Sequence, residues 1–249
     1  MAPERRHTPL APSCATPHAC PRPVRLHALS RARYFADLPP AAIETIDARM
    51  RVRGYAEDTP IHRVGAAATH LYVLAEGKVK LIRPTLEGDD VLIDVLTPGD
   101  LFGSAAALGH ATYPDTAHTL TVACALSISA RDFRAVLVEY PQVALAVLDD
   151  VTQRLEQAHT TVRRLASGTV EHRVASTLLA LADKAGEPRG EEILLQLPLT
   201  RPDLAAMTGT TTESVSRTLS RLRRAGVIAT GRRWISITDR GRLAELARH

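Results

Sequence analysis

Three side chains between positions 213 and 217 have the chemistry needed to read base pairs. Glu213, Ser216 and Arg217 stand three and four residues apart in the segment ESVSR, so on a helix they share one face. A carboxylate accepts a hydrogen bond from the amino group of cytosine, a guanidinium donates to N7 and O6 of guanine, and a hydroxyl adds a further contact. Because a helix fits the major groove of DNA, this spacing predicts a base-reading helix.

A two-helix unit is predicted to hold these side chains. Thr200 with Asp203, and Thr210 with Glu213, have the spacing of a capping box, which satisfies free N–H groups where a helix begins. Gly209 supplies the tight turn between the two helices. The apolar residues of the second helix recur at helical spacing and face inward: Val215, Leu219 and Leu222. The pattern predicts a helix-turn-helix, and an ordinary αα-hairpin packed in a core is the alternative.

Basic and hydroxyl side chains near this unit are candidates for the phosphate backbone. Two β-type runs at 227–228 and 234–237, joined by Gly231-Arg232-Arg233, predict a hairpin wing. From Arg201 onward ten arginines stand against four acids, whereas the other 200 residues carry a net charge of −2. This block favours double-stranded DNA as a partner, with a solvated basic face as the alternative. The predicted phosphate contacts are Arg201, Thr211, Thr212, Arg221, Arg232 and Arg233.

Short β-type runs separated by evenly spaced glycines fill residues 51–130. The runs are 70–74, 78–82 and 91–96, and glycine recurs at 54, 65, 77, 88 and 99. Such spacing predicts an antiparallel barrel or jelly roll, which can enclose a ligand or be packed with side chains. Before the roll, a short helix is predicted over 34–50, starting around Leu38-Pro39-Pro40. Residues 1–30 carry six prolines and are predicted to be disordered or extended.

A narrow apolar seam runs along the helical stretch that follows the roll. Its members step by four, four, three and four residues: Val147, Val151, Leu155, Ala158 and Val162. A seam of two apolar residues per heptad predicts a coiled-coil homodimer. The alternative is a helix packed on its own barrel, which would use a broader apolar stripe.

These elements predict an α+β protein with an N-terminal antiparallel β-roll, a long dimerisation helix and a C-terminal winged helix-turn-helix. The expected parts are a disordered tail (1–32), a β-roll sensor domain (33–137), the dimerisation helix (138–167) and the DNA-binding domain (168–249). No apolar run approaches the ~18 residues that span a bilayer, and the N-terminus has no apolar core of a signal peptide. We therefore expect a cytoplasmic protein that does not bind membranes.

Four segments, in this order, resemble the Crp/Fnr family of bacterial transcription regulators. They are GYAEDTPIHRVG (54–65), LYVLAEGKVKL (71–81), PGDLFG (98–103) and LTRPDLAAMTGTTTESVSRTLSRL (199–222). The resemblance covers about residues 33–241. It implies a non-enzymatic dimer that binds palindromic DNA, contacts RNA polymerase and usually activates transcription.

The resemblance also bears on the signal. Cyclic-AMP-responsive members have a Gly-Glu pair after the PGD turn and an Arg-Ser or Arg-Thr pair further on. Here Ser104 follows Gly103, and the later stretch HATYPDTAHT (110–119) has no arginine. Because an anionic phosphate buried without a cation is costly, we expect the signal to be something other than cyclic AMP: redox, gas or stress. The segment ESVSR matches the fumarate-and-nitrate-reduction branch, which implies half-sites like TTGAT in inverted repeat.

That branch senses oxygen through an iron–sulfur cluster held by N-terminal cysteines and one cysteine of the roll. Cys124 lies where the roll cysteine would be, but a small buried hydrophobe also explains it. Only Cys14 and Cys20 are available in the tail, and His18 could be a further ligand. We expect no cofactor; a cluster, a haem with a histidine ligand and redox chemistry between the tail thiols are alternatives.

Two other classes of protein remain to be weighed. A cupin-like β-roll enzyme would need a His-x-His pair with a nearby Glu. The histidines of the roll are isolated from one another: His62, His70, His110 and His118. A plain cyclic-nucleotide-binding module of a larger enzyme is opposed by the helix-turn-helix.

Overall fold

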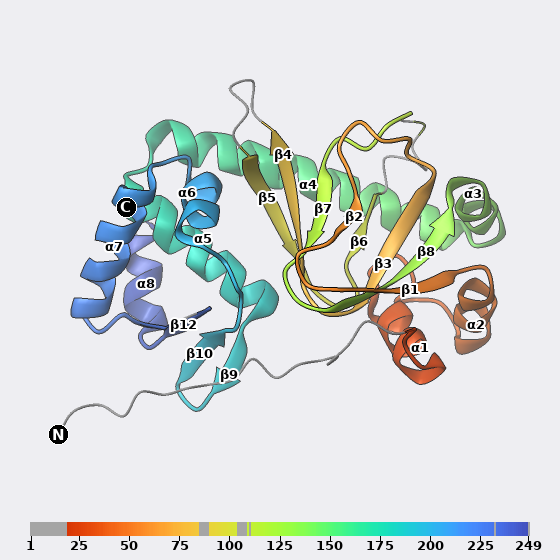
Figure 1. Ribbon diagram of the computed structural model, residues 1–249, viewed down its shortest axis with the longest axis horizontal. Helices are drawn as coiled ribbons and strands as arrows, with labels where there is room; N and C mark the ends of the chain where they lie inside the picture. Colours follow the sequence, from red (N-terminus) through yellow and green to blue (C-terminus); the bar gives the residue numbers. More distant parts are fainter. Residues whose placement is uncertain (1–18, 85–89, 104–108, 110, 232, 249) are drawn as a thin grey trace.

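Two antiparallel four-stranded sheets form a roll over residues 51–129 of the computed structural model, which describes residues 19–84, 90–103, 109, 111–231 and 233–248 (Figure 1). The first sheet has the order β1-β8-β3-β6: β1 (Arg51–Tyr55), β8 (Ala123–Ser129), β3 (His70–Glu76) and β6 (Leu101–Phe102). The second has the order β2-β7-β4-β5: β2 (Pro60–His62), β7 (Thr116–Thr119), β4 (Val79–Pro84) and β5 (Asp90–Leu96). The predicted roll is confirmed.

The inner faces of the two sheets meet in a core that includes Leu74, Leu96 and Phe102, each at most 2% exposed. One of the spaced glycines, Gly77, has a clear structural reason. Its φ is +89°, and a Cβ there would lie 2.5 Å from the carbonyl oxygen of Val122. Only glycine tolerates both the backbone angle and the close approach at this turn between β3 and β4.

Helices cover the outer face of the first sheet: α1 (Arg22–Arg31), α2 (Pro40–Ala48) and α3 (Ala130–Glu139). The expectation of disorder up to residue 32 is wrong for residues 22–31. Pro21 is the N-cap and Pro23 lies in the first turn, where the missing N–H costs nothing. Leu29 is fully buried. Arg25 forms two hydrogen bonds, of 3.0 and 2.6 Å, with the carboxylate of Asp47 on α2.

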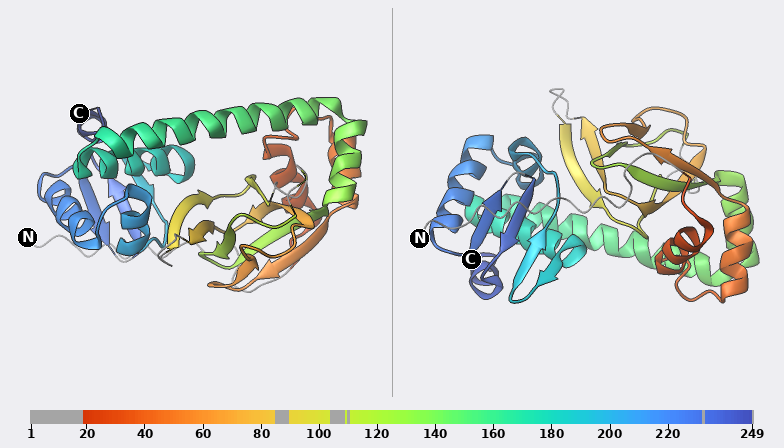
Figure 2. Two further views of the ribbon diagram at one scale, coloured as in Figure 1. Left: turned by 90° about the horizontal axis from the view of Figure 1, so that it is seen from above. Right: turned by 60° about the horizontal axis from the view of Figure 1, so that its bottom comes forward.

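The predicted helix over 34–50 is α2, which begins at Pro40, within the expected start at Leu38-Pro39-Pro40. Its apolar residues Ile43 and Ile46 are buried. The long helix α4 (Pro141–Ser167) begins three residues after the predicted start at 138 and connects the roll to the C-terminal domain (Figure 2). The two residues at 138–139 belong to α3 instead.

The C-terminal domain is a winged helix. Helix α5 (Val170–Ala185) leads into a four-stranded sheet of order β11-β12-β10-β9, with α8 (Arg240–Leu246) at the end. The remaining elements are β9 (Glu187–Arg189), β10 (Glu192–Leu195), α6 (Arg201–Thr208), α7 (Thr212–Arg224), β11 (Ile228–Gly231) and β12 (Trp234–Ile237). Helices α6 and α7 are the predicted helix-turn-helix, and β11 and β12 are the predicted wing. Within the part of the chain that is described, no helix is both long and apolar enough to cross a membrane.

Candidate nucleic-acid interface

The N-terminus of α6 has the predicted capping box. The Thr200 hydroxyl accepts from the Asp203 N–H at 3.2 Å, and the Asp203 carboxylate accepts from the Thr200 N–H at 2.8 Å. Gly209 ends the helix in the left-handed region with φ +56°. This geometry sets the sharp change of direction between the two helices.

The predicted capping box of α7 is wrong. Thr210 still belongs to the turn, because its N–H donates to the carbonyl of Ala205 at 3.1 Å. The N-cap is Thr211, whose hydroxyl accepts from the N–H of Ser214 at 3.2 Å. The cap lies one residue later, so Glu213 occupies the second helical position with its side chain exposed.

Helix α7 divides into a buried and an exposed face. Its inward residues are at most 1% exposed: Val215, Leu219 and Leu222. Glu213 and Arg217 are exposed and Ser216 is half-buried. The described contact of the Arg217 guanidinium is a 3.4 Å approach to the Ser214 hydroxyl, too long to hold the side chain firmly. The structure therefore brings the three predicted base-reading residues to the first turns of one solvent-facing helix.

The predicted phosphate contacts are placed in three different settings. Thr211 and Thr212 are exposed at the N-terminus of α7, where the helix dipole favours anions. Arg221 forms an ion pair of 2.9 Å with Glu171 on α5. Arg201 is half-buried beside a cavity, and Arg232 lies outside the described residues.

Arg233 differs most from its predicted place. Its guanidinium forms an ion pair with the carboxylate of Glu57 in the roll and lies 3.5 Å from the carbonyl oxygen of Leu120. The φ of Arg233 is +67°, in the tight turn of the wing. Arg233 of the wing therefore lies on the roll, where Glu57 competes with phosphate for its guanidinium.

This pair leads to a prediction. Glu57→Gln should release Arg233 for the phosphate backbone, so affinity should rise alike for all DNA sequences. An exposed ion pair is worth about 0.2–1 kcal/mol, which is up to about fivefold in affinity. The slope of log affinity against log salt should steepen by about 0.9, the value for one phosphate. Fluorescence anisotropy over several salt concentrations measures both quantities.

Glu191→Gln, which removes the same charge from an exposed loop of the DNA-binding domain, is the control and should change neither quantity. Adding Arg233→Ala to Glu57→Gln should remove the gain. A gain that survives in the double variant would mean that Arg233 is not the side chain released.

Residues that the sequence analysis did not identify hold the helix-turn-helix in place. Arg173 on α5 donates to the carbonyls of Thr208 and Gly168, at 2.7 Å each, and thus anchors the turn after α6. Lys80 of the roll forms an ion pair of 3.1 Å with Asp203. Asp203 lies 123 residues from Lys80 and Thr208 lies 35 residues from Arg173 along the chain, so no local sequence pattern indicates these two contacts.

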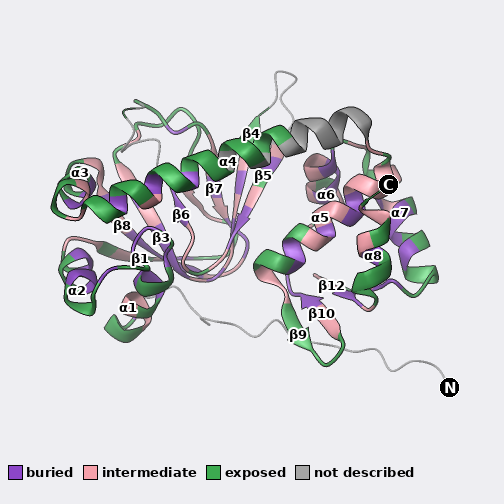
Figure 3. Ribbon diagram, turned by 180° about the vertical axis from the view of Figure 1, so that it is seen from behind, coloured by how far each residue is buried: buried purple, intermediate pink, exposed green. Residues whose placement is uncertain are grey.

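Helix α4 carries an exposed apolar stripe, and Figure 3 shows that much of the described part of this helix is exposed. Its members are Leu145, Leu148, Val151 and Leu155, each 42–64% exposed. Val147 was predicted in this seam but is 8% exposed and belongs to the core between the outer face of the first sheet and the helices α1–α3. From Val147 to Leu155 the predicted seam takes two steps of four residues, which rotate the side-chain direction around the helix by about 80°. Val147, at the start of the seam, therefore faces the roll domain while Leu155 faces solvent. Ala158 is exposed, and the Val162 side chain lies outside the described residues.

An aromatic cluster fills part of the roll. The ring of His62 stacks on Tyr113 with centroids 4.1 Å apart, and Tyr72 stacks on Phe102 at 5.2 Å. The His62 Nε2 lies 2.9 Å from a carboxylate oxygen of Asp115. Burial, followed by the hydrogen bond with Tyr113, raises the pKa of Tyr72 far above its ordinary value, so this phenol stays neutral.

The candidate metal ligands are only partly described. Cys20 and Cys124 are both buried and are not in a disulfide. The Cys20 sulfur lies 3.9 Å from a carboxylate oxygen of Glu76. Cys14 and His18 lie outside the described residues. Among the residues that the structure does describe, no group of three or more His, Cys, Asp or Glu side chains could hold a metal ion.

A β-roll joined by one long helix to an exposed helix-turn-helix defines a sensor-coupled, DNA-binding transcription regulator. Residues 52–140 match the family model of the cyclic nucleotide-binding domain, and residues 172–246 match the Crp-like helix-turn-helix domain. The chain belongs to the Crp/Fnr family of transcription regulators.

Known relatives cover most of the chain. The "Probable transcriptional regulator flp" of Lacticaseibacillus casei is 32% identical over 188 residues, 76% of this chain and 83% of that protein. The "CRP-like cAMP-activated global transcriptional regulator" of Mycobacterium tuberculosis is 26% identical over 220 residues, 88% of this chain and 98% of that protein. The structure of FixK2 from Bradyrhizobium japonicum has a TM-score of 0.71 at 24% identity, covering 79% of this chain and 96% of that one, and shows the same fold. These relatives are regulators, so the protein is not an enzyme and the cupin-like alternative is wrong.

Proposed function

We propose that the protein is a homodimeric regulator that reads a TTGAT-like inverted repeat and activates transcription through RNA polymerase in response to a signal other than cyclic AMP. The exposed first turns of α7 carry this proposal. Glu213, Ser216 and Arg217 stand there in the E-x-x-S-R order of the fumarate-and-nitrate-reduction branch. The charged residues suit the cytosine and guanine of such a half-site.

The test of the proposed site is binding to a labelled duplex with two TTGAT half-sites in inverted repeat. A duplex with both half-sites scrambled is the control. We expect at least about a thousandfold preference for the repeat at physiological salt, the lower end for specific regulators. Equal affinity for both duplexes would refute the proposed sequence preference, although not membership of the family. Adding RNA polymerase and a promoter with this repeat tests activation.

Dimerisation is supported by the apolar stripe of α4. Leu148 and Leu155 are 61% and 55% exposed, and two copies of a regulator that reads an inverted repeat need such a contact. The stripe is too hydrophobic to be an ordinary solvated helix face. A second copy of the same helix covers it with matching chemistry.

A signal other than cyclic AMP is supported by the charge inside the roll. Asp115 lies in the stretch 110–119, where cyclic-AMP-responsive members place an arginine. Its carboxylate is paired with His62, and the side chain of Arg83 is 4.0 Å away. A cyclic phosphate would therefore meet the carboxylate of Asp115, and the guanidinium of Arg83 beside it already faces that carboxylate. The name of the mycobacterial relative describes the effector of that protein, which is 26% identical to this chain.

Cyclic AMP is accordingly expected to give no saturable heat in calorimetry at micromolar concentration and to leave the affinity for the TTGAT duplex unchanged. The physical reason is the uncompensated phosphate charge described above. Micromolar binding together with tightened DNA binding would contradict this prediction. A visible absorption spectrum and an iron and sulfide assay on protein purified without oxygen test the redox and gas alternatives in the same preparation.

A further inference from the structure

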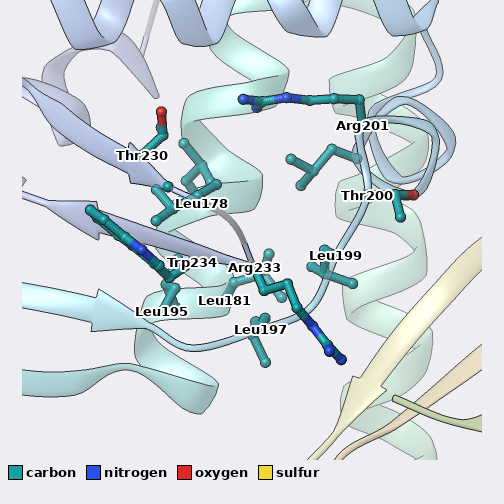
Figure 4. Close-up of a pocket in the computed structure, with 13 residues that line it drawn as sticks. Leu178, Leu181, Leu195, Leu197, Leu199, Thr200, Arg201, Thr230, Arg233 and Trp234 are labelled. Carbon is teal, nitrogen blue, oxygen red and sulfur yellow. The ribbon is translucent and has the colours of Figure 1, made fainter. Parts of the chain in front are cut away.

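The DNA-binding domain contains a cavity of about 200 Å³ between α5, α6 and the wing. Trp234, Thr230 and Arg201 also line it (Figure 4). Six of its thirteen lining residues are leucines: Leu178, Leu181, Leu195, Leu197, Leu199 and Leu204. A leucine-lined cavity of about 150 Å³ holds benzene in another protein, so a slightly larger one suits a chain of about eight carbons.

A positive charge lies at the edge of this apolar space. In Figure 4 the Arg201 side chain extends across the cavity toward the side on which Thr230 lies. Arg201 is half-buried, and within the described part of the chain its guanidinium has no hydrogen bond or ion pair. Burial, and then the positive charge of Arg223, lower the pKa of Arg201. Both effects disfavour the charged form and would be relieved by an anion.

The nearby acid cannot supply that anion. Asp203, two residues further along α6, is occupied by the Thr200 cap and by Lys80. Of the two described arginines that line the cavity, Arg233 is paired with Glu57, so the combination is an apolar cavity with the unpaired guanidinium of Arg201 at its edge. Its complement is a molecule with one anionic head and one short apolar chain.

We infer that this cavity is an effector site for a medium-chain carboxylate, with the carboxylate on Arg201 and the alkyl chain against the leucines. The ligand would lie between α6 of the helix-turn-helix and the wing. Among the described residues, none of the three base-reading residues of α7 lines the cavity, whereas Arg233 lines it and pairs with Glu57 of the roll. The inference does not depend on the proposed DNA sequence or on the signal of the roll.

Octanoate is the probe, and Trp234 is the reporter because it is the single tryptophan of the chain and lines the cavity. We expect saturable change of its fluorescence below the micelle concentration of octanoate. From butanoate to octanoate the affinity should rise by about fourfold for each added methylene group. Octylammonium, with the opposite charge, should bind at least about tenfold more weakly.

Variants separate the head group from the chain. Arg201→Leu should weaken octanoate binding at least about tenfold, and Arg201→Lys should retain most of it. Leu199→Phe should weaken binding by filling the cavity while keeping the charge. Arg189→Leu, which removes an exposed arginine from β9, is the matched control and should bind as the parent does. Circular dichroism and thermal midpoints confirm that each variant is folded.

Three results would overturn the inference: no saturable change with octanoate, no dependence on chain length, or equal octanoate affinity in the folded Arg201→Leu and parent proteins. If Arg201 serves only as a phosphate contact, Arg201→Leu will weaken DNA binding while octanoate does not bind to either protein. That outcome also overturns the inference and leaves the proposed function intact.

Discussion

Leu155→Lys is expected to convert the protein to a monomer and to lower its affinity for the inverted repeat by at least about a hundredfold. Leu155 is 55% exposed on the α4 stripe, in line with Leu148 and Val151. In a dimer the two copies of the stripe face each other, so the substitution would bury two ammonium groups without partners. A monomer contacts only one half-site. It therefore loses the affinity that a dimer gains because its second subunit binds at a high effective concentration, about 10²–10⁴-fold.

Sedimentation velocity measures the oligomeric state, and anisotropy on the repeat measures the affinity. Gln153→Lys adds the same charge to an exposed position of the same helix and should leave both unchanged. Leu148→Lys should behave like Leu155→Lys, whereas Val147→Lys should instead unfold part of the roll because Val147 is buried there. A Leu155→Lys protein that still sediments as a dimer would place the interface elsewhere.

Arg217→Ala is expected to abolish the preference for one base pair of each half-site. The loss of a bidentate guanine contact should cost about 1–3 kcal/mol on the repeat and almost nothing on a duplex with that pair replaced. The guanidinium is exposed, and its 3.4 Å approach to Ser214 is weak, so the free protein does not hold it away from DNA.

The measurement is a set of duplexes with single-base changes, each titrated at several salt concentrations. Arg224→Ala is the matched control, because Arg224 is exposed near the C-terminal end of the same helix. It should leave the order of preference among duplexes intact. An Arg217→Ala protein that keeps the full preference at every base pair would show that α7 does not enter the groove as proposed.

The local features of the DNA-binding domain were predictable from the sequence alone. The Thr200–Asp203 capping box, the turn at Gly209 and the buried face of α7 depend on residues within about one or two helical turns of one another. The evenly spaced glycines and the short β-type runs that predicted the roll are also patterns within short stretches of the chain. The cap of α7 was predicted at Thr210 but is Thr211, because Thr210 belongs to the turn that follows Gly209.

Contacts between distant segments were decided only by the tertiary structure. Residues 22–31 form a helix despite Pro23, because Leu29 is buried in the core and Arg25 pairs with Asp47 on α2. Val147 left the predicted seam because the roll lies against that side of α4. Arg233 meets Glu57, 176 residues away. Spacing along a chain determines which residues share a face of an element, but what that face meets depends on how the elements pack, and this packing placed Arg233 on the roll and Arg201 beside a cavity.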